Sequence, residues 1–293
     1  MKENSHSEFR SYVALGIGVI AITWSAIFVR WAAIPGPASA FYRVLFAFVL
    51  LAPFAFWRVQ SVSRSSLLWA AAGGVFFAGD IGLFNSAVMA TTATSATLLA
   101  FVSPVIVGLL AWLISRRAPQ PVFWVGLIVS VAGSALVAGS DLFHHAALGL
   151  GDMMALSASL CFAGYLLVTE HVRRSMPATL LLGCSLAATV VSLLIFSLAA
   201  GVPLKIPNTH SLLALLGLGI ICQLLGYLSL TYALGHLPAT VTSVTLLLQV
   251  PLTAVLAIVL LHEQLSWQQT AGGLLVLVGV GIVNRFGRNP VEV

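Results

Sequence analysis

Runs of about twenty apolar residues recur along this chain, and they restrict its fold more than any other feature. Short polar or proline-rich segments, such as Pro35-Gly36-Pro37 and Pro203 to His210, separate them. A helix of about 20 apolar residues crosses the roughly 30 Å of hydrocarbon in a bilayer. The sequence therefore predicts ten transmembrane helices, near residues 12–30, 38–57, 67–88, 93–115, 121–139, 149–169, 179–200, 211–233, 238–260 and 267–285.

The scarcity of charge supports the same interpretation. The 293 residues are 60% hydrophobic and only 7% charged, whereas a soluble domain is about 25% charged. Thirteen basic and eight acidic side chains cannot cover a soluble protein of 30.8 kDa, so most of the surface must face lipid. The net charge of +5 would suggest nucleic-acid binding in a soluble protein. Here the basic residues lie mostly between apolar runs, where they orient helices in a membrane, and no nucleic acid is expected as a partner.

The distribution of basic residues tests the number of helices. Cytoplasmic loops collect Lys and Arg, and with ten helices and a cytoplasmic N-terminus the outer loops hold only Arg30 and Lys205, while Arg43 lies within the second run. Both termini are therefore predicted to be cytoplasmic, in a multi-pass protein of the inner cell membrane. The ten predicted cytoplasmic basic residues are Lys2, Arg10, Arg58, Arg64, Arg116, Arg117, Arg173, Arg174, Arg285 and Arg288.

Cysteines and the first apolar run add two further expectations. Cys161, Cys184 and Cys222 all lie inside apolar runs without metal-ligand spacing, so they are interpreted as small apolar side chains, with no metal site and no cofactor. Residues 12–29 lack a cleavage site of small residues followed by a soluble domain, so they are interpreted as a transmembrane helix rather than a signal peptide.

An internal repeat divides the chain into two halves. A shift of 147 residues places Pro104 on Pro251 and Gly126 on Gly273. Five helices per half is an odd number, so the second half must be inverted relative to the first, a known plan of transporters. The predicted fold is all-α and integral to the membrane, with ten transmembrane helices in two inverted five-helix repeats. The expected divisions are a tail at 1–11, repeats at 12–140 and 141–286, and a tail at 287–293.

Several motifs resemble the drug/metabolite transporter superfamily, specifically its EamA-type members with ten helices. The resemblance covers nearly the whole chain and rests on Trp24-Ser25, Arg43, Ser103-Pro104-Val105, Gly151 to Leu156, Cys161 to Tyr165, Gln249-Val250-Pro251, Leu261 to Leu265, Gly272-Gly273 and Gly279. The glutamate that many members carry after the fourth helix is absent, and Arg116-Arg117 stands there instead. The resemblance, which extends to YddG-type amino-acid exporters, implies an exporter of metabolites or amino acids in the inner membrane.

Polar groups deep inside transmembrane helices mark either helix contacts or a substrate pathway. We expect a central cavity between the repeats that combines one carboxylate with amides, hydroxyls and aromatic rings, which would suit an amino acid. The predicted pathway residues are Trp24, Asp80, Phe84, Thr97, Phe101, Phe162, Gln223, Tyr227, Thr245 and Gln249.

Each of these residues also has a structural interpretation. Asp80 could belong to a structural ion pair, the glutamines could bond neighbouring helices, and the aromatic residues could simply fill the core. Arg43 is expected to extend toward the interface or to meet an acid there, with a direct role toward substrate as the alternative. Pro104 and Pro251 can kink the fourth and ninth helices, and we expect them to act in gating.

Other classes of function fit the sequence less well. His262-Glu263 lacks the second histidine of a zinc helix, and no glycine-rich phosphate loop is present, so an enzyme is not expected. A channel usually needs a ring of subunits or a repeated filter sequence. The sequence predicts a secondary transporter or facilitator that works by alternating access and exports small metabolites, aromatic or broadly neutral amino acids above all, as a monomer. A multidrug or cationic-compound exporter of the same superfamily is the alternative.

Overall fold

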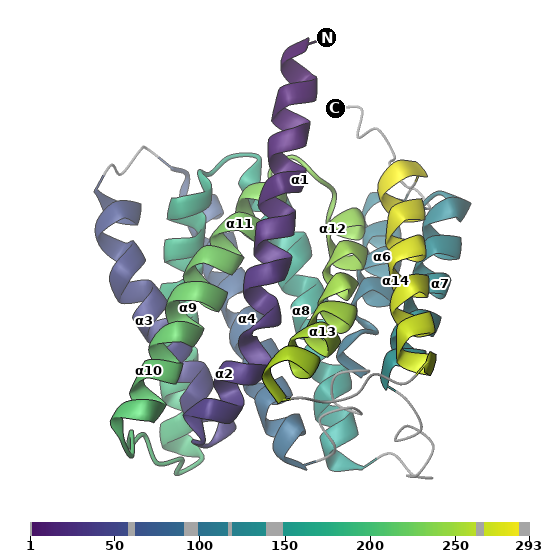
Figure 1. Ribbon diagram of the computed structural model, residues 1–293. Coiled ribbons are helices and arrows are strands. Elements are labelled where there is room, and N and C mark those ends of the chain that lie inside the picture. The colour runs from purple at the N-terminus through teal and green to yellow at the C-terminus, as the bar shows by residue number, and fades with distance from the viewer. Residues whose placement is uncertain are drawn as a thin grey trace.

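A computed structural model describes residues 2–57, 62–90, 99–116, 119–138, 149–261 and 267–286 of the chain (Figure 1). All regular elements among these residues are helices. The helices of the first half are α1 (Lys2–Thr23), α2 (Ser25–Ala32), α3 (Gly36–Phe56), α4 (Arg64–Ala90), α6 (Ser103–Ser115) and α7 (Pro121–Ala138). Those of the second half are α8 (Leu150–Arg173), α9 (Ala178–Ala199), α10 (Thr209–Gly217), η2 (Leu218–Gly226), α11 (Tyr227–Ala233), α12 (Ala239–Thr245), η3 (Leu246–Leu248), α13 (Gln249–Leu261) and α14 (Trp267–Phe286).

The helices account for the ten predicted transmembrane segments. Seven of the described helical segments are at least 18 residues long and apolar enough to cross a membrane. Three shorter apolar segments, Ser103–Ser115, Pro121–Val137 and Ala239–Thr253, complete the set of ten. Large apolar side chains are exposed on many of these helices, as lipid-facing surfaces require. Examples are Ile20, Val49, Leu68, Leu113, Ile195 and Leu277. The prediction of an all-α membrane protein is therefore confirmed.

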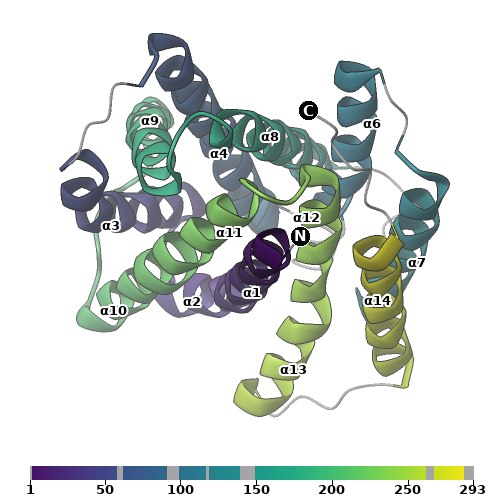
Figure 2. The same ribbon diagram turned by 90° about the horizontal axis from the view of Figure 1, so that it is seen from above.

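Equivalent helices of the two halves lie against each other. α7 and α14 form a close pair, and α3 contacts α9 while α6 contacts α12. Seen from above, α6, α7 and α14 lie on one side of the molecule and α3, α9 and α10 on the other, with α1 between them (Figure 2). The beginning of α1 and the end of α14 lie at the same end of the bundle (Figure 1).

The α7–α14 contact shows how the two halves are oriented. A side-chain carbon added at Gly126 would lie 2.8 Å from the carbonyl oxygen of Gly279, and one added at Gly133 would lie 2.6 Å from that of Gly272. The contacts thus run forward along α7 and backward along α14, so these equivalent helices are antiparallel. This is the arrangement that an inverted repeat requires.

Four transmembrane segments are interrupted near their middle, and one of them is the segment of α6, which a turn at residues 101 and 102 precedes. Between α1 and α2 the helix breaks at Trp24, where the Thr23 hydroxyl donates to the Val19 carbonyl (2.7 Å), a bond that commonly bends helices. The segment from α10 to α11 contains the π-helix η2, and the segment from α12 to α13 contains the 3₁₀ turn η3. Such departures from α-helix are frequent at functional sites.

Candidate functional site

Arg43 is the centre of a buried polar arrangement on α3. Its side chain is only 5% exposed. Its Nε donates to Gln223 Oε1 (2.7 Å) on η2, and its Nη1 donates to Ser25 Oγ (3.0 Å) at the start of α2. The expectation that Arg43 extends toward the interface is wrong, because Gln223 and Ser25 hold the guanidinium inside the bundle.

Gln223 reaches this arrangement from the π-helix. The residue is completely buried, and neighbouring Gly219 brings η2 close to α3, since a side-chain carbon at that glycine would lie 3.1 Å from the Arg43 carbonyl oxygen. A wider helical turn rotates the side chains that follow it, and η2 ends where Tyr227 begins α11. The π-helix therefore helps to direct Gln223 toward α3.

Asp80 approaches the same place from α4. It is partly exposed, and its charge interacts with that of Arg43. No ion pair within 4.0 Å joins the two groups in the part of the chain that the structure describes. The carboxyl group and the guanidinium therefore lie near each other but are not in direct contact. Asp80 also interacts electrostatically with Tyr227, the residue on which the shift of 147 places it.

Aromatic rings surround these polar groups. The Arg43 guanidinium lies 5.4 Å from the centre of the Tyr227 ring, a cation–π distance. Phe77 on α4 stacks near both Tyr227 (4.7 Å between ring centres) and Tyr165 (4.8 Å) on α8. We call Ser25, Arg43, Asp80, Gln223 and Tyr227 the central polar cluster. Its residues come from four transmembrane segments of both repeats, so it joins the two halves of the molecule.

The structure brings some of the predicted pathway residues together. Asp80, Gln223 and Tyr227 belong to the central polar cluster. Phe162 is connected to it through Tyr165, whose ring centre lies 6.2 Å from that of Phe162 and 6.1 Å from that of Tyr227. Thr97 lies outside the described residues. These four residues are therefore the part of the predicted set that could act at one place.

The remaining predicted residues lie in separate surroundings. Trp24 packs with Phe28 and the α10 side chains, Phe84 packs near Ala87 and Ala155, and Phe101 packs against the group around Phe123. The Thr245 hydroxyl bonds with the amide of Asn284 on α14 (3.0 Å) and with the Val241 carbonyl (2.8 Å). Gln249 is partly exposed at the start of α13.

Both predicted kink residues follow a break in their transmembrane segment. Pro104 is the second residue of α6, directly after a turn at residues 101 and 102. Pro251 is the third residue of α13, directly after the 3₁₀ turn η3. Proline lacks a backbone donor and fits the first turn of a helix. The two equivalent segments are thus each broken just before their proline.

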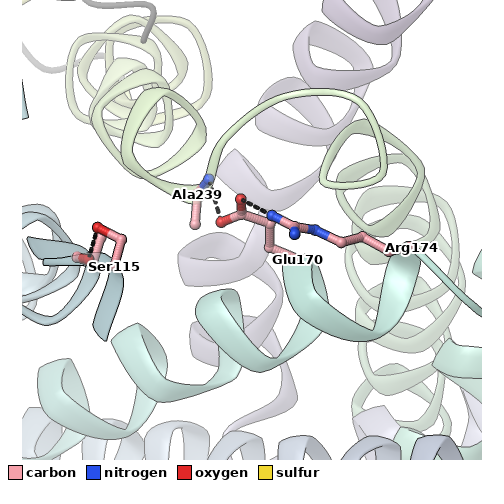
Figure 3. A network of polar contacts seen from close by, with 5 residues as sticks. Ser115, Glu170, Arg174 and Ala239 are labelled. Carbon is pink, nitrogen blue, oxygen red and sulfur yellow. Dashed lines mark hydrogen bonds and ion pairs between the residues drawn. The ribbon is translucent and has the colours of Figure 1, made fainter. Parts of the chain in front are cut away.

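A second polar network joins the end of α8 to the start of α12 (Figure 3). Glu170 on α8 accepts a hydrogen bond from the backbone N–H of Ala239 (3.0 Å), the first residue of α12. Its other oxygen lies 3.9 Å from Nη2 of Arg174. Arg173 instead donates to the Thr231 and Met176 carbonyls. This network fastens α8 to α12 and is separate from the central polar cluster.

The described residues contain no group of three or more His, Cys, Asp or Glu side chains placed to hold a metal ion. Cys161, Cys184 and Cys222 are free thiols at buried or partly buried positions. The central polar cluster offers donors, one carboxylate and aromatic faces, which can bind a small polar molecule.

Sequence reasoning undervalued Arg43 and did not select Ser25, Phe77 or Tyr165. For Arg43 a signal was available, because a charged residue in the middle of an apolar run is costly and is usually functional or paired. For the other three no comparable signal exists, since hydroxyl and aromatic residues are common at every depth of such helices.

Comparison with known proteins agrees with the fold. An uncharacterized transporter of Archaeoglobus fulgidus is 27% identical over 247 residues, which cover 82% of this chain and 85% of that protein. The uncharacterized transporter YwfM of Bacillus subtilis is 29% identical over 210 residues, covering 70% of this chain and 69% of YwfM. A solved crystal structure has a TM-score of 0.77 over 98% of this chain and 99% of its own, at 17% identity, which shows a shared fold.

The family comparison covers both halves separately. The model of the EamA-like transporter family matches residues 10–139 and again residues 149–285. The two matches fall on either side of the segment between α7 and α8, in agreement with the two helical repeats. The chain belongs to the EamA-like transporter family.

Proposed function

We propose that this membrane transporter is a secondary transporter that exports small metabolites, amino acids above all, by alternating access. The observation that carries the proposal is the central polar cluster. It holds a guanidinium and a carboxyl group, those of Arg43 and Asp80, near each other but without a direct ion pair. A zwitterion has the matching pair of charges. Tyr227, Phe77 and Phe162 supply aromatic surface suited to a neutral or aromatic side chain.

Alternating access is supported by the interrupted helices. In transporters with inverted repeats, substrate sites lie near the bilayer midplane beside discontinuous helices. Here the break at Trp24 lies in the first segment, and the breaks within η2 and at η3 lie in two segments that both contact α1. We propose that Pro104 and Pro251 mark the points at which the fourth and ninth segments bend during the cycle, and that the cavity opens between the two repeats.

A multidrug exporter of cations is the competing function. Such a protein would use Asp80 to attract a cation. Arg43 argues against it, because a buried guanidinium near Asp80 repels a ligand that carries only positive charge. A zwitterionic ligand avoids this repulsion through its own negative group.

Transport by purified protein in proteoliposomes tests the proposal. Labelled neutral and aromatic amino acids should show saturable exchange, measured with and without a pH gradient and compared with empty liposomes. Flux that does not saturate would indicate a channel. Export of organic cations with no amino-acid flux would establish the competing function.

Two substitutions connect the flux to the proposed cavity. Asp80→Asn and Gln223→Ala should lower amino-acid flux by about tenfold, the effect of losing one charged or well-placed hydrogen bond in a site. Gln268→Ala, on the exposed start of α14, is the matched control and should keep normal flux. Size-exclusion profiles check that the variants are folded. Normal flux in both Asp80→Asn and Gln223→Ala would contradict the proposed cavity.

A further inference from the structure

Two buried donors in the central polar cluster have no hydrogen-bond partner among the described residues. They are Nη2 of Arg43, whose side chain is 5% exposed, and Nε2 of Gln223, which is completely buried. An unsatisfied buried donor costs about 1–3 kcal/mol, and more where the group is charged. Two such donors on residues that bond each other therefore require an explanation.

The hydrogen-bonding groups of Arg43 and Gln223 determine which of their donors remain free. A guanidinium has only donors, so the Gln223 amide must turn its oxygen toward Arg43 and its NH₂ group away. Nε and Nη1 of Arg43 are engaged by Gln223 and Ser25. Nη2 is bonded to the same carbon as Nε, and Nε2 of Gln223 is bonded to the same carbon as Oε1. The two free donors therefore flank the hydrogen bond between Nε and Oε1.

The charges define the missing acceptor further. Arg43 is buried, one face of its guanidinium is covered by Tyr227, and Asp80 interacts with it only over a distance. Buried charges are normally paired and hydrogen-bonded. A water molecule can accept hydrogen bonds from such donors, but it would leave the charge of Arg43 without a direct partner. An acceptor with two oxygens and a negative charge satisfies both requirements.

We propose that Arg43 Nη2 and Gln223 Nε2 form a binding subsite for the carboxylate of the transported molecule. The inference rests on the proposed function and adds the orientation of the ligand. The carboxylate is bound at the Arg43–Gln223 side, and the ammonium group points toward Asp80. Ser25 and Tyr227 are positioning residues, because they hold the guanidinium from its other edge and from one face.

Binding of matched acid and amide ligands to purified protein tests the subsite. The probes are L-leucine and L-phenylalanine with their carboxamides, and dissociation constants are measured from ligand-induced thermal stabilisation. The wild type should bind each acid about tenfold more tightly than its amide, as expected for one charge-assisted pair. Arg43→Gln should reduce this preference to less than about threefold. Arg64→Gln, which removes an exposed arginine at the start of α4, should keep it.

A second variant covers the case in which Arg43→Gln does not fold. Gln223→Met keeps Arg43 and the side-chain volume but removes the Nε2 donor, so it should also reduce the preference for acids. Undiminished preference in a folded form of either variant would overturn the subsite.

The same assay separates failure of the subsite from failure of the proposed function. If neither amino acids nor their amides bind, amino-acid export is wrong, and benzoate is then compared with benzamide. Tighter binding of benzoate that is lost in Arg43→Gln supports the carboxylate subsite without amino-acid transport. Equal binding of benzoate and benzamide overturns the carboxylate subsite. Chloride that stabilises the protein over the same concentration range as benzoate also overturns it.

Discussion

Single residues fasten the transmembrane segments to one another, and Glu170 is the clearest case. Its carboxylate accepts the backbone N–H of Ala239, one of the four donors that a helix leaves without an internal partner at its start. The preceding residue is Pro238, which has no side-chain acceptor to offer this donor. Glu170 therefore caps α12 from another helix, and its pairing with Arg174 across 3.9 Å is secondary.

Two substitutions separate these contributions. Glu170→Ala should lower the free energy of unfolding by about 1–2 kcal/mol, because it removes a charge-assisted hydrogen bond at a helix start. Arg174→Ala should change it by less than about 0.5 kcal/mol, since the Arg174 side chain is 63% exposed and exposed ion pairs contribute little. Thermal unfolding of the detergent-solubilised protein provides the measurement. Equal losses in both variants would mean that the ion pair, and not the cap, stabilises this end.

The sequence could identify individual polar residues but not their partners. Asp80 and Gln223 stand out in their apolar runs, and the structure places both in the central polar cluster. Arg43 stands out equally, yet a long side chain in a membrane can either extend to the interface or turn inward. The direction of the Arg43 side chain depends on where Gln223 and Ser25 lie across the bundle. Its contacts with these residues span 180 and 18 residues of sequence.

At the scale of elements, the α7–α14 pair depends on glycines, which have no side chain to keep the two helices apart. Gly126 and Gly133 on α7 face Gly279 and Gly272 on α14, so the two backbones approach closely. Small residues permit this contact in lipid, where helices associate through packing rather than through the hydrophobic effect. The pair joins the last helix of each repeat and so contributes to holding the halves together.

A methyl group at this contact should therefore destabilise the protein. Gly279→Ala would place its Cβ 2.5 Å from the Gly126 carbonyl oxygen. Because this oxygen belongs to the backbone of α7, the clash can be relieved only if α7 and α14 move apart. Overpacking of this kind typically lowers stability by about 1–3 kcal/mol. Gly281→Ala, two residues further along α14, meets nothing within 4 Å and should leave the melting temperature unchanged or slightly higher. Similar melting temperatures for the two variants would contradict the close contact.

The elements were predictable where a residue type causes the feature. Apolar length predicts the ten segments, and proline predicts a bend near positions 104 and 251, where each helix indeed begins after a break. The π-helix η2 and the break at Trp24 have no such cause in their local sequence. η2 contains neither proline nor a polar run, and Thr23 bends α1 through a hydroxyl bond that most threonines in helices can form.

At the scale of the whole molecule, inversion of the repeats determines which surfaces meet. α7 lies against α14, α3 against α9, and α6 against α12, so each of these contacts joins equivalent transmembrane segments of the two halves. Asp80 and Tyr227, which the shift of 147 superimposes, both reach the central polar cluster. The weak sequence repeat predicts that Asp80 and Tyr227 are equivalent positions. Only the fold brings these two equivalent residues to one place.

Ten transmembrane segments, an even number, predict that both ends of the chain lie on the same face of the membrane. The start of α1 and the end of α14 lie at one end of the bundle (Figure 1), the end that carries Glu170, Arg173 and Arg174. Because basic loops stay in the cytoplasm, fusions of green fluorescent protein to either terminus should fluoresce. Alkaline phosphatase joined after Lys205, between α9 and α10, should be active, whereas phosphatase joined after Arg174 should be inactive. Termini on opposite faces would require an odd number of segments, and two inverted five-helix halves would then be impossible.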